Sequence, residues 1–194
     1  MTRGRAVIVG GSMSGLLSGL LLRRAGWAVD VYERVDSELS GRGAGIVAQY
    51  ELIERLRGLG LATDDLGVHV TTRKILDAQG RLTHEIECPQ VLTAWERVYR
   101  LLRDAFSPEH YHRGRGLTKF TQSSKGVQAH FSNGETVEAD LLVGADGIRS
   151  TVRQQCMALA IVGVDMAQAE RASGQGKPPW CADRRRLRRG YLRR

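Results

Sequence analysis

The chain has 194 residues, of which 42% are hydrophobic and 26% charged, a composition typical of one globular domain with its own core. Its three cysteines, Cys88, Cys156 and Cys181, are widely spaced and form no C-x-x-C pair. This pattern argues against a disulfide framework and against a zinc site. It fits a reducing cytoplasm, where we expect the protein to be located.

The net charge of +8 is unevenly distributed along the chain. Residues 1–156 carry a net charge of +2, whereas residues 157–194 carry +6. Because the first part is almost neutral, it lacks the basic surface of a nucleic-acid-binding domain, and we expect no nucleic-acid partner.

The apolar segment Ala6–Leu22 follows Arg3 and Arg5, an order that also occurs in signal peptides. Four glycines and three serines interrupt this segment, and Arg23 and Arg24 stand where a cleavage site would be. A membrane span needs about 20 predominantly apolar residues. We therefore expect the segment to fold inside the domain, with no membrane anchor.

The same segment predicts a nucleotide site. Its pattern indicates a strand over Arg5–Val9, a tight glycine turn, a helix over Ser14–Ala25 and a second strand over Ala28–Tyr32, which leads to Glu33. Such a turn brings backbone N–H groups against a pyrophosphate at the positive end of the helix dipole. Glu33 follows Gly15 by 18 residues, close to the spacing expected for a carboxylate that accepts a ribose hydroxyl.

The turn departs from the G-x-G-x-x-G fingerprint at one position. It reads Gly10-Gly11-Ser12-Met13-Ser14-Gly15, with serine in place of the middle glycine. Serine is small and offers a hydroxyl, so the prediction of a nucleotide site stands. The alternative is a βαβ unit in which the glycines serve only packing.

The rest of residues 1–156 predicts an α/β domain with an antiparallel insertion. The expected segments are a Gly-rich loop at Ser40–Val47, helices over Gln49–Leu59 and Thr93–Phe106 (Thr93 as the N-cap), a hairpin of Val70–Leu76 and Leu82–Ile86, and antiparallel strands Leu117–Gln122, Gly126–Phe131 and Thr136–Val137.

A second strand–acid–helix pattern occurs later in the chain. The apolar strand Ala139–Val143 leads to Asp146, and a helix over Ile148–Gln155 follows. Asp146 would lie at the carboxyl edge of the sheet, where open α/β folds bind ligands, and could accept hydrogen bonds from sugar hydroxyls. It could equally be the N-cap of the helix, and the motif by itself favours neither role.

Together these motifs resemble the single-component FAD monooxygenases of the p-hydroxybenzoate hydroxylase type, from Ala6 to about Cys156. The stretches GGSMSGL, LSGRGAGIVAQ and WERVYRLLRDAF resemble the branch that contains dihydroxypyridine 3-hydroxylase. The resemblance implies a Rossmann-like FAD-binding βαβ core in a truncated glutathione-reductase-like FAD domain. It implies that the following residues bind FAD: Gly10, Gly11, Ser12, Met13, Ser14, Gly15, Glu33, Arg34, Arg42, Ala44, Gly45, Ile46, Val47 and Asp146.

The resemblance also implies a reaction. NAD(P)H reduces the flavin, oxygen adds to give a 4a-hydroperoxyflavin, and a small aromatic or N-heteroaromatic substrate is hydroxylated. Because the cofactor carries this chemistry, no catalytic side chain is expected, and the five histidines are predicted to be packing or surface residues. Many family members have an arginine where this chain has Trp95, so we expect one cofactor contact to be lost or supplied differently.

The family pattern ends near Cys156, and residues 157–194 read as an irregular Arg-rich tail. We expect a truncated, frameshifted product that binds FAD weakly and has little or no hydroxylase activity. The alternative is a nonenzymatic nucleotide-binding chain whose basic tail binds acidic partners. We do not expect a flavin disulfide reductase, since no redox cysteine pair lies near the first helix.

Overall fold

The computed structural model describes residues 2–41 and 44–161. The predicted Arg-rich tail lies outside these residues, apart from the end of one helix. The elements in chain order are β1 (Arg5–Val9), α1 (Met13–Arg24), β2 (Ala28–Tyr32), β3 (Gly45–Ala48), α2 (Tyr50–Gly58), β4 (Val68–Leu76), β5 (Leu82–Ala94), α3 (Trp95–Ala105), η1 (Pro108–His110), β6 (Tyr111–His112), β7 (Leu117–Ser123), β8 (Gly126–Phe131), β9 (Thr136–Ala139), β10 (Leu141–Gly144) and α4 (Thr151–Ile161).

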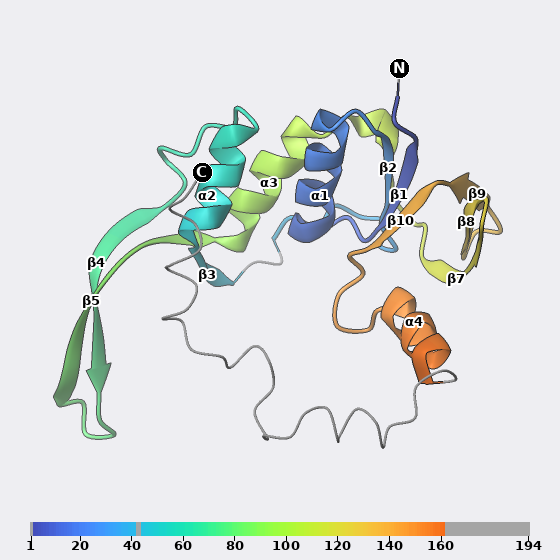
Figure 1. Cartoon of the computed structure of the whole chain (residues 1–194). Helices are drawn as coiled ribbons and strands as arrows, with labels where there is room; N and C mark the ends of the chain where they lie inside the picture. The colour runs from blue at the N-terminus through green and yellow to red at the C-terminus, as the bar shows by residue number, and fades with distance from the viewer. Residues whose placement is uncertain (1, 42–43, 162–194) are drawn as a thin grey trace, which may run out of the picture. The chain divides into compact units, whose positions relative to one another are not determined.

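A four-stranded parallel sheet organises the domain, with the strand order β10-β1-β2-β6. Figure 1 labels three of these strands, β10, β1 and β2. Val9 at the end of β1 is in register with Gly144 on one side and with Tyr32 on the other. The carboxyl ends of these three strands therefore meet at one edge of the sheet. The predicted βαβ core is confirmed, and the strand predicted over Ala28–Tyr32 has those bounds.

Strand β1 is buried on both faces, as its continuous apolar run predicts. Ala6 and Ile8 belong to a core cluster that includes Leu16 of α1 and Phe106 beyond α3. Val7 and Val9 face a second cluster, formed with the antiparallel sheet β7-β8-β9. The alternation of side chains along a strand thus places one helical layer and one sheet layer on opposite faces of β1.

A second antiparallel sheet has the order β3-β5-β4 and contains a long hairpin. Most of β4 and the first half of β5 are exposed to solvent. The predicted antiparallel insertion is thus confirmed, but the second strand of the hairpin was predicted too short, because β5 continues from Leu82 to Ala94.

Three local predictions were wrong. Thr93 is not the N-cap of α3, because Ala94 takes that position and the Thr93 hydroxyl donates to the backbone carbonyl of Leu66. The Gly-rich loop contains a strand, β3, which pairs with the end of β5. The last helix begins at Thr151 rather than Ile148 and extends through Cys156.

Asp30 of β2 connects the edge strand β6 to the sheet through side-chain hydrogen bonds. Its Oδ1 lies 3.1 Å from His110 Nδ1 and 3.0 Å from His112 Nε2, and its Oδ2 accepts a hydrogen bond from Arg5 at 3.2 Å. Burial by itself would raise the pKa of Asp30, but the hydrogen bonds from His112, His110 and Arg5 outweigh it and lower the pKa below 3.8.

Because this pKa is lowered on folding, the stabilisation that Asp30 provides is present above about pH 4 and is lost as the pH falls through the folded-state value. We expect Asp30→Asn to lower the free energy of unfolding by about 1–3 kcal/mol at pH 6. The difference from the unchanged chain should shrink below pH 4, as measured by urea unfolding at several pH values. A difference that is constant down to pH 3 would contradict this assignment.

Candidate functional site

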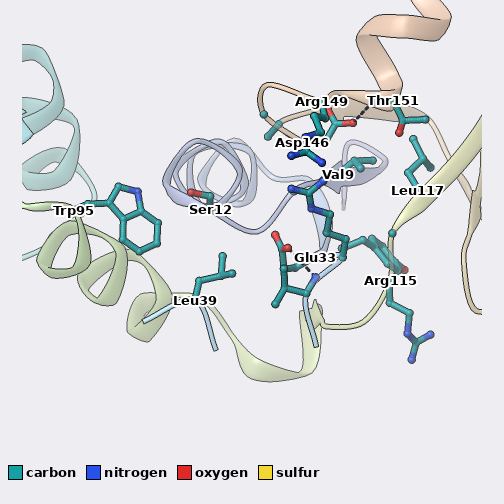
Figure 2. Close-up of a pocket in the computed structure, with 17 residues that line it drawn as sticks. Val9, Ser12, Glu33, Leu39, Trp95, Arg115, Leu117, Asp146, Arg149 and Thr151 are labelled. Carbon is teal, nitrogen blue, oxygen red and sulfur yellow. Dashed lines mark hydrogen bonds between the residues drawn. The ribbon is translucent and has the colours of Figure 1, made fainter. Parts of the chain in front are cut away.

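A pocket of about 400 Å³ opens at the carboxyl edge of the parallel sheet. Figure 2 shows that residues from the ends of three strands converge on it, among them Val9, Glu33 and Asp146. The pocket is also lined by Trp95, at the start of α3, and by Leu117, at the start of β7. A site at this edge is where open α/β sheets bind ligands.

The glycine turn between β1 and α1 is closely packed. A Cβ atom on Gly15 would lie 1.8 Å from the carbonyl oxygen of Gly10, so no side chain fits at position 15. Gly10 itself has a φ of +105° and lines the pocket. These contacts keep the beginning of α1 directly against the end of β1.

The N-terminus of α1 is available to a ligand. The N-cap residue, Ser12, makes no side-chain capping hydrogen bond and lines the pocket. The first N–H groups of any α-helix have no partner within the helix and carry the positive end of its dipole. The turn and the helix therefore present donors suited to an anion.

Glu33 is buried at the end of β2, with 6% of its surface exposed. Its Oε2 accepts a hydrogen bond from Gly11 N at 2.8 Å and its Oε1 accepts one from Val35 N at 2.9 Å. A carboxylate can accept about four hydrogen bonds, so Glu33 can hold the turn and still accept a ligand hydroxyl.

Asp146 lies after β10, and its side chain accepts hydrogen bonds at the beginning of α4. Its Oδ2 accepts hydrogen bonds from Thr151 N at 2.7 Å and Val152 N at 3.2 Å, and its Oδ1 accepts one from the Ser150 hydroxyl at 2.6 Å. The predicted N-cap role was wrong, because α4 begins at Thr151 and Ser150 takes the N-cap position, its hydroxyl accepting a hydrogen bond from Arg153 N at 2.9 Å. The Asp146 side chain instead accepts from the first N–H groups of α4 from outside the helix. Asp146 also lines the pocket, so a second role towards a ligand remains a prediction.

We expect Asp146→Ala to lower the free energy of unfolding by about 1 kcal/mol, an effect similar to that of removing an N-cap acceptor, because the N–H groups of Thr151 and Val152 lose their acceptor. Asp146→Asn should lower the free energy of unfolding by a smaller amount, since asparagine also accepts hydrogen bonds at helix N-termini. Urea unfolding of the two variants would measure this difference. Equal losses would argue against this role of Asp146.

Three arginines line the pocket: Arg34, Arg115 and Arg149. Only Arg34 was among the predicted site residues. Arg115 pairs with Glu135 and stands between two glycines just before β7, and Arg149 follows Asp146 closely in the chain. Both Arg115 and Arg149 lie close to glycines in the sequence, and this was the signal that could have pointed to them. No local sequence pattern shows that the two segments that contain these arginines meet.

The predicted site residues in the described part of the chain divide into three groups. Gly10, Ser12, Glu33, Arg34 and Asp146 line the pocket, whereas Gly11, Met13, Ser14 and Gly15 belong to the turn and the first turn of α1 without lining it. Ala44, Gly45, Ile46 and Val47 are not among the pocket residues; Ala44 accepts a hydrogen bond from Trp95 N, and the other three lie in β3. Arg42 lies outside the described residues.

Trp95 supplies a flat aromatic wall to the pocket. Its ring stacks on that of Tyr99, with centroids 4.8 Å apart and an interplanar angle of 8°. The pocket therefore gains an apolar surface at this position, and its positive charge comes from arginines on other segments.

Within residues 2–41 and 44–161, no cluster of three or more His, Cys, Asp or Glu side chains could hold a metal ion. Cys88 and Cys156 are both free thiols. In the same part of the chain, no helix has both the length and the apolar character that a membrane crossing requires.

A family model described as FAD binding domain matches residues 3–171. The chain belongs to this family. The FAD-binding domain is 39% identical over 159 residues to 2,6-dihydroxypyridine 3-monooxygenase of Paenarthrobacter nicotinovorans, and the match covers 81% of this chain and 40% of that protein. It is 30% identical over 162 residues to aurachin C monooxygenase/isomerase of Stigmatella aurantiaca, covering 78% of this chain and 42% of the relative.

The solved structure of 2,6-dihydroxypyridine-3-hydroxylase from Arthrobacter nicotinovorans superimposes with a TM-score of 0.75 at 39% identity, covering 81% of this chain and 40% of that one. The chain thus spans about 40% of the length of these relatives. Both the predicted family and the predicted α/β fold are confirmed by these matches.

The residues present fit an FAD molecule. The lack of a side chain at Gly15 lets α1 begin directly against the end of β1. The first N–H groups of α1 suit a pyrophosphate, and Glu33 lines the pocket with acceptor capacity left for a ribose hydroxyl. The arginines around the pocket offset the negative charge of two phosphates.

Proposed function

We propose that this FAD-binding domain, residues 1–156, holds FAD by its adenosine and pyrophosphate groups and serves the NAD(P)H-dependent hydroxylation of a small aromatic or N-heteroaromatic ring. The observation that carries the proposal is the convergence of the glycine turn, Glu33 and Asp146 on one pocket at the carboxyl edge of the sheet. When bound, FAD supplies the hydride and oxygen chemistry.

The chain's own residues provide binding and orientation. The turn from Gly10 to Ser12 and the N-terminus of α1 would hold the pyrophosphate, and Glu33 would fix the adenosine ribose. The indole of Trp95 would exclude water from one side of the cofactor. No residue of the pocket is needed to form a covalent bond with substrate.

The ring substrate is proposed from similarity. The relative at 39% identity is named for 2,6-dihydroxypyridine, which makes a hydroxylated pyridine the first substrate to test. The cysteine pattern supports a cytoplasmic location for this reaction.

Titration of the purified chain with FAD and with riboflavin, followed by flavin fluorescence, tests the cofactor part. We expect FAD to bind more tightly, because riboflavin lacks both the pyrophosphate and the adenosine. Equal affinities would contradict the proposed site.

Oxygen consumption with NADH or NADPH tests the enzymatic part. Stimulation by 2,6-dihydroxypyridine would support hydroxylation. Tight FAD binding with no such stimulation would favour the second candidate, a nonenzymatic nucleotide-binding chain.

A further inference from the structure

The backbone of Gly11 is held by two buried side chains, one at each of its adjoining peptide groups. Its N–H donates to Glu33 Oε2 at 2.8 Å, and its carbonyl oxygen accepts a hydrogen bond from the Tyr111 hydroxyl at 2.9 Å. Glu33 and Tyr111 are each 6% exposed. Both hydrogen bonds are therefore shielded from water, which strengthens them and makes their loss costly.

Tyr111 reaches the turn from an edge strand 100 residues away in the sequence. It lies in the two-residue strand β6, in register with Val31 of β2. The guanidinium carbon of Arg103 on α3 lies 4.2 Å from the centroid of the Tyr111 ring. The position of the Tyr111 ring is thus fixed by the pairing of β6 with β2 and by the contact with the Arg103 guanidinium.

Tyr111 also accounts for the glycine at position 11. A Cβ atom there would lie 2.3 Å from the Tyr111 hydroxyl oxygen and 2.7 Å from the ring carbon that bears it. The φ of Gly11 is not in the left-handed region, so backbone conformation does not require glycine at this position. The close approach of the tyrosine ring does.

The pocket residues on either side of Gly11 are Gly10 and Ser12, whereas Tyr111 is not one of the residues that line the pocket. Tyr111 therefore contacts the turn from outside the pocket. We infer that Tyr111 is a positioning residue: its hydroxyl fixes the Gly11–Ser12 peptide so that the turn faces the pyrophosphate of FAD. This inference rests on the proposed function, since it assigns a role in the same cofactor site.

Tyr111→Phe tests the role of the hydroxyl, because it keeps the ring and removes the group that donates to the Gly11 carbonyl and also interacts with Tyr99. We expect the dissociation constants of FAD and of ADP to rise about fivefold, since both ligands carry the pyrophosphate and one buried hydrogen bond is lost. Thr93→Val is the matched control: it removes another buried hydroxyl that donates to a backbone carbonyl, far from the turn in sequence. It should lower the melting temperature without changing either dissociation constant.

A second pair of variants keeps the test decisive if Tyr111→Phe is poorly stable. Gly11→Ala should weaken FAD binding in the unchanged chain, because the new methyl group meets the tyrosine ring. In a Tyr111→Leu background, where the outer ring atoms are absent, the same Gly11→Ala change should have a smaller effect.

The inference is overturned if Tyr111→Phe binds FAD as tightly as Thr93→Val does, or if Gly11→Ala is equally harmful in both backgrounds. Failure of this inference can be distinguished from failure of the proposed function. If the unchanged chain binds no FAD, the proposed function fails and the positioning role fails with it.

Discussion

Gly15→Ala is expected to abolish measurable FAD binding and to lower the free energy of unfolding by about 1–3 kcal/mol. The added methyl carbon would lie 1.8 Å from the carbonyl oxygen of Gly10, a distance that no side-chain rearrangement can relieve, because both partners are backbone or Cβ atoms. Helix α1 must therefore move away from β1. That movement displaces the N–H groups at the start of the helix, which are the proposed pyrophosphate donors.

Gly58→Ala is the matched control for this substitution. Gly58 is also a helical glycine, at the end of α2, and a Cβ atom there would meet only an arginine nitrogen at 3.9 Å. We expect FAD binding to be unchanged and stability to be equal or slightly higher, since alanine is the better helix former. Fluorescence titration and urea unfolding of both variants provide the comparison. Normal FAD affinity in Gly15→Ala would show that the turn does not hold the cofactor.

Glu33→Ala is expected to have the second large effect. It removes the acceptor of two backbone N–H groups, those of Gly11 and Val35, and leaves the first of them buried without a partner. We expect the free energy of unfolding to fall by about 2–4 kcal/mol and the dissociation constant of FAD to rise at least about tenfold. Thermal unfolding with and without FAD would measure both changes.

Two further variants sharpen this prediction. Glu33→Gln keeps the shape and one acceptor but turns an amide donor towards a backbone N–H, so its effect should be intermediate. Glu54→Ala removes an exposed carboxylate, and its effect should stay within about 0.5 kcal/mol. If Glu33→Ala behaved like Glu54→Ala, the carboxylate would have no part in holding the turn.

The parallel core could be predicted from sequence because its signals are local. A continuous apolar run defines β1, the glycines define the turn, and the acid after β2 follows at the expected spacing. The hairpin turn before Thr136 and the strand over Gly126–Phe131 were also correct, since Asn-Gly pairs favour tight turns.

The features that were missed depend on contacts between distant segments. Thr93 has the chemistry of an N-cap, but a hydrogen bond to the Leu66 carbonyl keeps it at the end of β5. Arg115 and Arg149 line the pocket because β7 and the segment after β10 come to the same edge of the sheet. Tyr111 contacts Gly11, which lies 100 residues earlier in the sequence, and no local sequence pattern indicates this contact.

Amide chemical shifts measured by NMR during FAD titration test most directly whether the turn from Gly10 to Gly15 binds the pyrophosphate of FAD. We predict that the amide signals of Gly10, Ser12 and Met13 shift with saturating FAD, while those of the exposed β4–β5 hairpin, such as Lys74 and Glu85, do not. Unchanged signals from the turn at saturating FAD would contradict the account.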